Sequence, residues 1–301
     1  MSFISGCGST NVDLLYEGMP RIPDVGEEIY SKDFKVRLGG GLPATLINLS
    51  RLGIETKIAT ELGCDMFSKF AENEYKKLGI KAVNLYNGDN IPVNITSAVI
   101  LENDRSFISY GKGGITCNNS TSDAIYNMAS GSKVILIQPD GFIDVYKKLK
   151  KEGAVFILDT GWEDGLSIDK YRDFLELADY YTPNRKEALK ITDTKSVEEA
   201  AKILNGFFND TIIKLDKDGC LYYDGNEFTY IKGIDEYNNV DSTGAGDAFL
   251  AGFAYGIYHE YSIKDAILFG NITGGKAVTD VGALSAYHNE KELIEQYKKY
   301  R

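Results

Sequence analysis

Short runs of apolar residues alternate along the chain with longer amphipathic segments. Residues 133–137 and 154–158 are apolar runs of strand length, and residues 3–7, 56–61 and 211–215 are also predicted to be strands. The amphipathic segments carry apolar side chains at helical spacing and include residues 46–52, 67–78 and 145–151. Continuous apolar strands separated by helices are typical of a parallel sheet that is covered on both faces. The pattern therefore predicts an α/β fold.

Residues 14–38 and 91–113 do not follow this pattern. Apolar and polar positions alternate in 93–101 and again in 106–110, and the polar residues between these runs predict a hairpin. Together with residues 14–38, which alternate more loosely, the hairpin is expected to form a small separate β-sheet. The 301 residues therefore fit a single α/β domain, residues 1–301, with a discontinuous β insertion.

A glycine-rich polar turn leads directly into an apolar helical segment at residues 241–253. Gly244 and Gly246 have no Cβ, so the backbone can approach a ligand closely there. The free amide groups of a helix that begins near Gly246 favour an anion. Asp247 stands at this point, either as a base that accepts a proton from a hydroxyl or only as a charge that stabilises the helix N-terminus. The residues alone leave both roles open.

Residues 241–247, with the sequence DSTGAGD, resemble the D-T-x-G-A-G-D signature of the ribokinase-type (PfkB) carbohydrate kinases. The resemblance implies a ribokinase-like three-layer α/β/α sandwich, with the small β-sheet as a lid over the sugar. It also implies phosphorylation of a primary hydroxyl of a sugar by ATP. Asp247 would be the catalytic base, and the backbone of Gly244, Ala245 and Gly246 would form the anion hole.

A polar cluster after the first predicted strand extends this resemblance. Residues 8–13 match the family's G-x-x-x-x-D pattern, which implies that Asp13, together with Asn11, binds the sugar. Amide and carboxylate groups suit sugar hydroxyls, but from the residues alone an Asx-type turn fits equally well.

A second glycine-rich segment precedes the helix at residues 46–52. Residues 39–53 resemble the family's G-G-x-x-x-N motif followed by a helix that ends in R-L-G, so the backbone of Gly39, Gly40 and Gly41 is expected to contact the sugar. Ala44 stands where the family has the Asn that binds the sugar. Asn48, one helical turn later, either replaces that Asn or is buried between helices.

Residues 183–187 resemble the family's P-N-x-x-E motif. The resemblance assigns Asn184 to the nucleotide phosphates and Glu187 to Mg²⁺. Because Mg²⁺ keeps several waters, Glu187 is expected to act through water. The same two residues also fit a capping box at the start of a helix. Lys214, at the end of an apolar strand, is a candidate for a phosphate contact. Asp216 replaces the first glycine of the family's G-x-x-G turn.

The C-terminal part carries the remaining motifs. Residues 279–283 resemble the T-x-x-G-A turn, so Gly282 and Thr243 are expected beside the nucleotide, with Asn271 near the adenine. By the same resemblance, Asp241 and Gly282 would hold a monovalent cation such as K⁺. Lys112, after the hairpin, is either a solvated lysine or a contact for an anionic group of the substrate.

Charge and composition exclude some classes of binding partner. The net charge of −11 argues against a nucleic acid, whose phosphates would be repelled. No apolar run approaches 18 residues, so no membrane span is expected, and the N-terminus lacks the pattern of a signal peptide. The four scattered cysteines form no C-x-x-C pair and no zinc spacing, which predicts buried thiols in a reducing cytoplasm. The resemblance further implies a homodimer formed through the lid.

The sequence therefore predicts a sugar kinase that uses ATP and Mg²⁺, with Asp247 as the base. A nucleoside kinase of the same superfamily is the first alternative, because Ala44 changes the expected sugar site. A sugar sensor without catalytic activity is the second alternative. It is less favoured because Asp247 and the glycines of the anion hole are all present.

Overall fold

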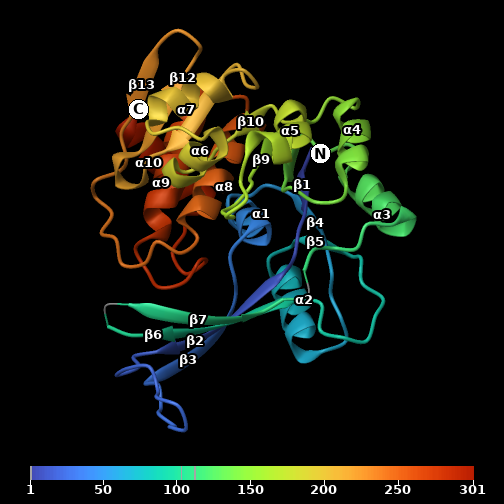
Figure 1. Ribbon diagram of the computed structural model, residues 1–301, viewed down its shortest axis with the longest axis vertical. Helices are drawn as coiled ribbons and strands as arrows, with labels where there is room; N and C mark the ends of the chain where they lie inside the picture. Colours follow the sequence, from blue (N-terminus) through green and yellow to red (C-terminus); the bar gives the residue numbers. More distant parts are fainter. Residues whose placement is uncertain (1, 103, 112) are drawn as a thin grey trace.

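The structure, a computed structural model, describes residues 2–102, 104–111 and 113–301. Its central sheet has six parallel strands in the order β10-β9-β8-β1-β4-β5. These strands are β1 (Ile4–Cys7), β4 (Thr56–Thr60), β5 (Lys81–Asn84), β8 (Val134–Ile137), β9 (Val155–Leu158) and β10 (Tyr180–Tyr181). The predicted strands at residues 3–7, 56–61, 133–137 and 154–158 thus lie side by side in one sheet (Figure 1), whereas residues 211–215 belong to a second sheet.

Successive residues of these strands point into two different cores, because side chains alternate across a sheet. In β8, Val134 and Leu136 belong to one buried cluster, whereas Ile135 and Ile137 belong to the other. The first cluster includes side chains of α1 (Leu42–Arg51), α2 (Met66–Lys77), α8 (Ala245–Tyr258), α9 (Ile263–Ala277) and α10 (Glu290–Tyr300). The second includes side chains of α3 (Asn119–Ala129), α4 (Ile143–Lys150), α5 (Ile168–Leu177), α6 (Arg185–Thr192) and α7 (Val197–Leu204). The sheet is therefore the middle of three layers.

An antiparallel sheet of three strands continues the central sheet beyond β10. It consists of β11 (Thr211–Lys214), β12 (Cys220–Tyr223) and β13 (Phe228–Ile231). The Lys214 amide donates to the Pro183 carbonyl at 2.8 Å and connects the two sheets. Strands β12 and β13 are joined by a turn, in which the Asp224 carboxylate accepts hydrogen bonds from the backbone amides of Asn226 and Glu227.

A separate four-stranded sheet projects from the body of the molecule (Figure 1). Its order is β3-β2-β6-β7, with β2 (Asn11–Glu17), β3 (Asp33–Leu38), β6 (Asn94–Ile100) and β7 (Arg105–Tyr110). The sequence pattern placed Asn11 and Asp13 in a turn after the first strand. They belong instead to β2, so the four-stranded sheet begins only a few residues after β1 ends.

Two further predictions concern membrane-spanning helices and the burial of the cysteines. In the described ranges, no helix is long and apolar enough to cross a membrane. Cys7 and Cys220 are buried as predicted, but Cys64 and Cys117 are exposed, so the prediction of buried thiols is wrong for these two residues.

Candidate active site

The N-terminus of α8 presents amide groups that lack protein acceptors. Gly244 caps the helix with φ of 78°, and a Cβ on this residue would lie 2.6 Å from the Cα of Ala283. Only glycine fits this contact. In the described chain, the amides of Gly244 and Gly246 donate to no protein group, whereas the amide of Ala245 donates to the Ser242 carbonyl at 3.3 Å. The turn can therefore offer at least two donors to an anion.

Asp247 lies next to this turn and is partly exposed. Its Oδ2 accepts a hydrogen bond from the Gly41 amide at 2.9 Å. Burial, followed by the negative charge of Asp159, raises the pKa of Asp247 from 3.8 to about 7, although the Gly41 hydrogen bond and the charge of Lys214 oppose this rise. A carboxyl group with a pKa near neutrality suits the transfer of a proton at physiological pH.

The glycine turn before α1 connects Asp247 with the four-stranded sheet. The Asn11 side chain donates to the Gly40 carbonyl at 2.7 Å and accepts from the side-chain amide of Asn94 at 2.8 Å. Asn11 thus holds the turn in place. A Cβ on Gly40 would lie 3.0 Å from Oδ2 of Asp247, so the backbone of the turn lies directly against the carboxylate.

Asp13 lies at the other end of the same turn. A Cβ on Gly39 would be 2.6 Å from Oδ1 of Asp13, so these two residues are in close contact. Burial raises the pKa of Asp13 to about 6. The Asp13 carboxylate accepts no hydrogen bond from the residues that the structure describes, and it is therefore available to a ligand. Asp13 and Asp247 thus flank the glycine turn from two different parts of the chain.

Ala44 and Asn48 lie behind the turn, on α1. Ala44 is fully buried, and its amide donates to the Gly41 carbonyl. Asn48 is also buried, and its Oδ1 lies 3.5 Å from Nη1 of Arg51 on the same helix. This contact gives Asn48 a partner within α1.

Lys214 brings a positive charge to the helix N-terminus. Its Nζ would lie 3.6 Å from a Cβ on Gly246. Among the described residues it forms no ion pair, yet its charge lowers the pKa of both Asp247 and Glu187. A lysine without a carboxylate partner beside free amides is well placed for a phosphate.

Asn184 and Glu187 form the capping box that the sequence allowed. The Asn184 side chain accepts from the Glu187 amide at 3.0 Å, and Oε2 of Glu187 accepts from the Asn184 amide at 2.8 Å. Oε1 of Glu187 accepts no hydrogen bond in the described chain. Burial raises the pKa of this carboxylate, with Lys214 acting in the opposite direction.

The protein side chains of this site suit a Mg²⁺ ion that is held mainly by water and by nucleotide phosphates. No three acidic, histidine or cysteine side chains in the described ranges gather closely enough to hold a metal. The open oxygen of Glu187 fits an outer-sphere ligand, since Mg²⁺ usually keeps several waters and binds the phosphates of its nucleotide.

Asp159 is a residue of this site to which the sequence assigned no role. It directly follows β9, and its charge raises the pKa of both Asp247 and Glu187. The available signal was its position, because polar residues at the carboxyl ends of parallel strands often contact ligands.

Asp241 joins the two turns that border the helix N-terminus. Oδ1 accepts from the Thr243 amide at 2.9 Å and from its hydroxyl at 2.7 Å, and Oδ2 accepts from the Gly282 amide at 2.9 Å. Arg105 of β7 also donates to Oδ1. Burial alone would raise the pKa of Asp241, but these hydrogen bonds and the charge of Arg105 hold it below its ordinary value. The carboxylate is surrounded by donors, so the arrangement does not fit a monovalent cation at Asp241.

Comparison with known proteins identifies the family. Residues 6–290 match the model of the pfkB family carbohydrate kinases. The chain belongs to this family. The expected class of enzyme, a sugar kinase that uses ATP, and the ribokinase-like fold are thereby confirmed.

Individual relatives extend over nearly the whole chain of this pfkB kinase. A ribokinase of Lactococcus lactis is 26% identical over 290 residues, which cover 94% of this chain and 93% of the relative. A 5-dehydro-2-deoxygluconokinase of Clostridium botulinum is 24% identical over 292 residues, covering 89% and 86% of the two chains. The structure of Arabidopsis thaliana ribokinase complexed with ribose and ATP superimposes with a TM-score of 0.81 at 24% identity, covering 99% of each chain. This last likeness concerns the fold.

Some residues that the motifs assigned to the nucleotide form hydrogen bonds with other residues of the protein instead. Asn271 donates to the carbonyls of Ile231 and Lys232 and accepts from the thiol of Cys220. The Thr243 hydroxyl and the Gly282 amide are both bound to Asp241. These hydrogen bonds stabilise the turns and the helix that surround the site.

The turn at Asp216 explains one departure from the family motif. Asp216 has φ of 56° and Gly219 has φ of 92°, so both have the positive φ that glycine adopts most readily. Aspartate tolerates this conformation better than most residues. The backbone of the G-x-x-G turn can therefore form although the first glycine is absent. Lys112, also considered from the sequence, lies outside the described residues.

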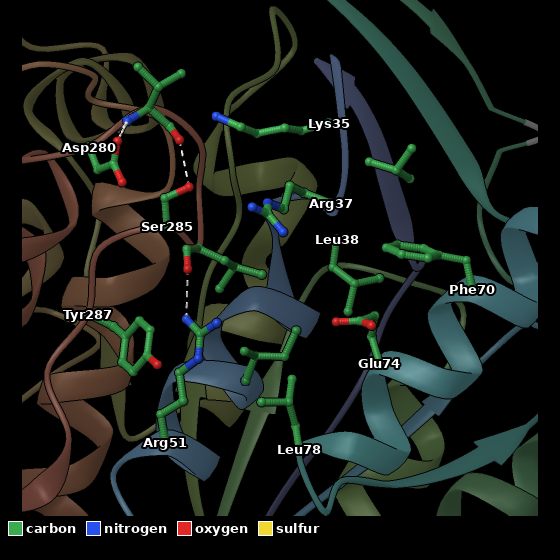
Figure 2. A pocket seen from close by; sticks show the side chains of 14 residues that line it. Lys35, Arg37, Leu38, Arg51, Phe70, Glu74, Leu78, Asp280, Ser285 and Tyr287 are labelled. Atoms are coloured by element: carbon green, nitrogen blue, oxygen red, sulfur yellow. Dashed lines mark hydrogen bonds between the residues drawn. The ribbon is translucent and has the colours of Figure 1, made fainter. Parts of the chain in front are cut away.

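A cavity of about 330 Å³ lies beside the site, between β3, α1, α2 and residues 280–287 (Figure 2). None of the predicted site residues lines it. The Arg51 guanidinium lies 3.8 Å from the centre of the Tyr287 ring and donates to the Leu284 carbonyl at 2.9 Å. Arg51 therefore anchors the segment after the Gly282 turn to the end of α1.

Proposed function

We propose that this kinase transfers the γ-phosphoryl group of ATP to a primary hydroxyl of a sugar or sugar derivative, with Asp247 as the base. One observation carries the proposal. The carboxylate of Asp247 lies between the glycine turn that ends near Asp13 and a helix N-terminus with two free amides. A proton acceptor and an anion site thus occur side by side.

Each residue of the site has a physical role in this reaction. Asp13 accepts a hydrogen bond from a sugar hydroxyl and, with the Gly39–Gly41 backbone, orients the sugar toward Asp247. The Asp247 carboxylate takes the proton of the attacking hydroxyl, whose oxygen forms the new bond to phosphorus as ADP leaves. The amides of Gly244 and Gly246 and the ammonium of Lys214 stabilise charge on the transferred group. Mg²⁺ would supply further charge neutralisation on the ATP phosphates, with Glu187 in its outer shell.

A panel of acceptors tests the proposal. ADP release is measured with ATP, Mg²⁺ and pentoses, hexoses, sugar acids and nucleosides in turn, and the phosphorylated product is identified by mass spectrometry. We expect product with at least one acceptor that has a primary hydroxyl, and almost none with Asp247→Asn. Release of ADP that depends on no acceptor, or equal turnover by the variant, would contradict the proposal.

Nucleosides belong in the panel because Ala44 is a buried methyl group where the family has a sugar-binding Asn. Preference for a nucleoside over every sugar would favour the alternative of a nucleoside kinase. The four free cysteines fit a reducing compartment, and we propose that the reaction takes place in the cytoplasm.

We further propose that the enzyme forms a homodimer through the four-stranded sheet. The strand register places Asp13 on one face of this sheet, and Phe34, Ile108 and Tyr110 on the other. These three apolar side chains are 49%, 74% and 48% exposed. An apolar face of this kind is typical of an interaction surface.

Light scattering after gel filtration tests the dimer. Ile108→Glu should give a monomer, because it places a charge in the apolar face. Val25→Glu is the matched control, since Val25 is fully exposed in the loop between β2 and β3. A wild-type monomer, or dissociation by both variants, would refute the proposed interface.

A further inference from the structure

Asp241 is a buried carboxylate that connects two separate turns. It is 7% exposed, and it binds Thr243, in the turn that leads into α8, and Gly282, in the turn after α9. These two turns pack tightly, since a Cβ on Gly244 would collide with Ala283. The buried carboxylate is compensated in two ways: the two backbone amides and the hydroxyl supply dipoles that lower its pKa, and a positive charge adds to their effect.

The compensating charge comes from the four-stranded sheet. Arg105, the first residue of β7, donates from Nη1 to Oδ1 of Asp241. The register pairs Arg105 with Ile100, and Asp13 with Thr96. Because residues 96 and 100 of β6 are separated by an even number of positions, Arg105 and Asp13 lie on the same face of the sheet. In Figure 1, the end of β6 and the start of β7 lie beneath the loops of the C-terminal half, drawn in orange and red.

The surroundings of Asp241 suit a guanidinium better than a metal cation. Its two oxygens already accept from four donors: the amide and hydroxyl of Thr243, the amide of Gly282, and Arg105. A monovalent cation would need several open oxygen ligands, but the nearest groups direct N–H and O–H dipoles toward the carboxylate. A planar guanidinium is itself a donor and fits among them.

We propose that Arg105 is a built-in cation that orders the anion-binding turn, so that catalysis needs no monovalent cation. This inference rests on the proposed function of that turn. Arg105 acts through Asp241 and is a positioning residue, because its hydrogen bond and ion pair are to Asp241 and not to Asp247. It also joins the sheet that carries Asp13 to the turn that carries Gly244 and Gly246. The ion pair thus adds to the Gly41–Asp247 hydrogen bond as a link between the sugar-binding side and the phosphate-binding side.

The test compares salts and variants at constant ionic strength. The wild-type kcat should be equal within about twofold in potassium, sodium and choline chloride. Arg105→Met should lower kcat by up to ~10²-fold, since small displacements of a catalytic turn have effects of this size. KCl or guanidinium chloride at millimolar concentration should restore part of this activity, because either cation can enter the space left at Asp241. Arg105→Lys should keep most of the activity and remain independent of K⁺.

Thermal unfolding gives a second readout that does not depend on turnover. The Tm of Arg105→Met should rise with KCl relative to choline chloride, whereas the Tm of the wild type should not. Lys35→Met is the matched control, because Lys35 lies in the same sheet and pairs with Glu17 and Asp33. It should behave as the wild type in both assays.

Three results would overturn the inference: severalfold activation of the wild type by K⁺, full activity of Arg105→Met in choline chloride, or a K⁺-dependent Tm in the wild type. If Arg105→Met does not fold, Arg105→Lys decides the question, since a requirement for K⁺ in that variant contradicts the proposal. If the wild type phosphorylates no acceptor, the proposed function fails, and the Tm series still tests the role of Arg105.

Discussion

Replacing Asp247 by Asn should make the protein less active but more stable. Burial raises the pKa of Asp247 from 3.8 to about 7, so the ionised form is disfavoured in the folded protein. A rise of this size corresponds to about 4 kcal/mol at high pH. Because the side chain is partly exposed and its surroundings can relax, we expect a net gain of only ~1–2 kcal/mol in the variant. In a chain of this size, this gain would raise Tm by ~2–6 °C.

The gain must depend on pH in a defined direction. The folded protein holds the Asp247 proton more tightly than the unfolded chain, so the contribution of this group to stability falls as pH rises from about 4 to about 7. Below this window the carboxyl is neutral in both states, and Asp and Asn should be equivalent. Above it, the wild type bears the full penalty, which Asn avoids. The difference in Tm between variant and wild type should therefore appear between pH 4 and pH 7 and then level off.

Calorimetry at pH 4, 6 and 8 measures this difference, with the exposed Asp89→Asn as the control. The same preparations should show a kcat reduced by roughly 10²–10⁴ for Asp247→Asn, with ATP binding nearly unchanged. The wild-type kcat/KM should rise with pH through about 7, since the base must be ionised. A Tm difference that does not change with pH would refute the burial argument, and unchanged turnover would refute the role as base.

Three further substitutions test other parts of the site. Gly244→Ala should lower stability by ~1–3 kcal/mol, because its φ is positive and its Cβ would collide with Ala283, whereas Gly246→Ala should have little effect on Tm; equal effects would contradict the close contact. Asp13→Asn should raise KM for the acceptor by ~10–10²-fold and change kcat less, as expected for a lost charged hydrogen bond; a selective effect on KM for ATP would place Asp13 elsewhere. Lys214→Met should lower kcat/KM for ATP by ~10²-fold, and an unchanged value would remove Lys214 from the phosphate site.

The layered core could be predicted because strands in its centre are apolar on both faces. Strand β8 (Val134–Ile137) illustrates this point, since all four of its side chains are apolar and buried. Alternate side chains of β8 enter different cores, so no polar position interrupts the run. The start of the four-stranded sheet was harder to predict. Its strand β2 follows β1 after a few polar residues, and Asn11 and Asp13 therefore had the appearance of a turn rather than of a strand.

In the site, the sequence could identify groups but not their partners. Asp241 is recognisable within its motif, yet Arg105 precedes it by 136 positions, and no local pattern connects the two residues. The sequence shows only that Asp159 follows a predicted strand. That its charge raises the pKa of Asp247 becomes apparent only when β9 takes its place in the sheet. At Asp216, the substitution removes a glycine but keeps the backbone conformation, and a motif based on letters does not record this.

The anion-binding turn at the start of α8 packs against a second segment of the chain, and the two segments leave the ribosome at different times. Gly244 is synthesised first, whereas Ala283, against which it packs, and Gly282, which is bound to the same carboxylate as Thr243, emerge later. A nascent or truncated chain that stops before residue 282 would carry Asp247 and its glycines without the wall that fixes them. Such a chain should not consume ATP, so the capacity for phosphoryl transfer would arise only late in translation.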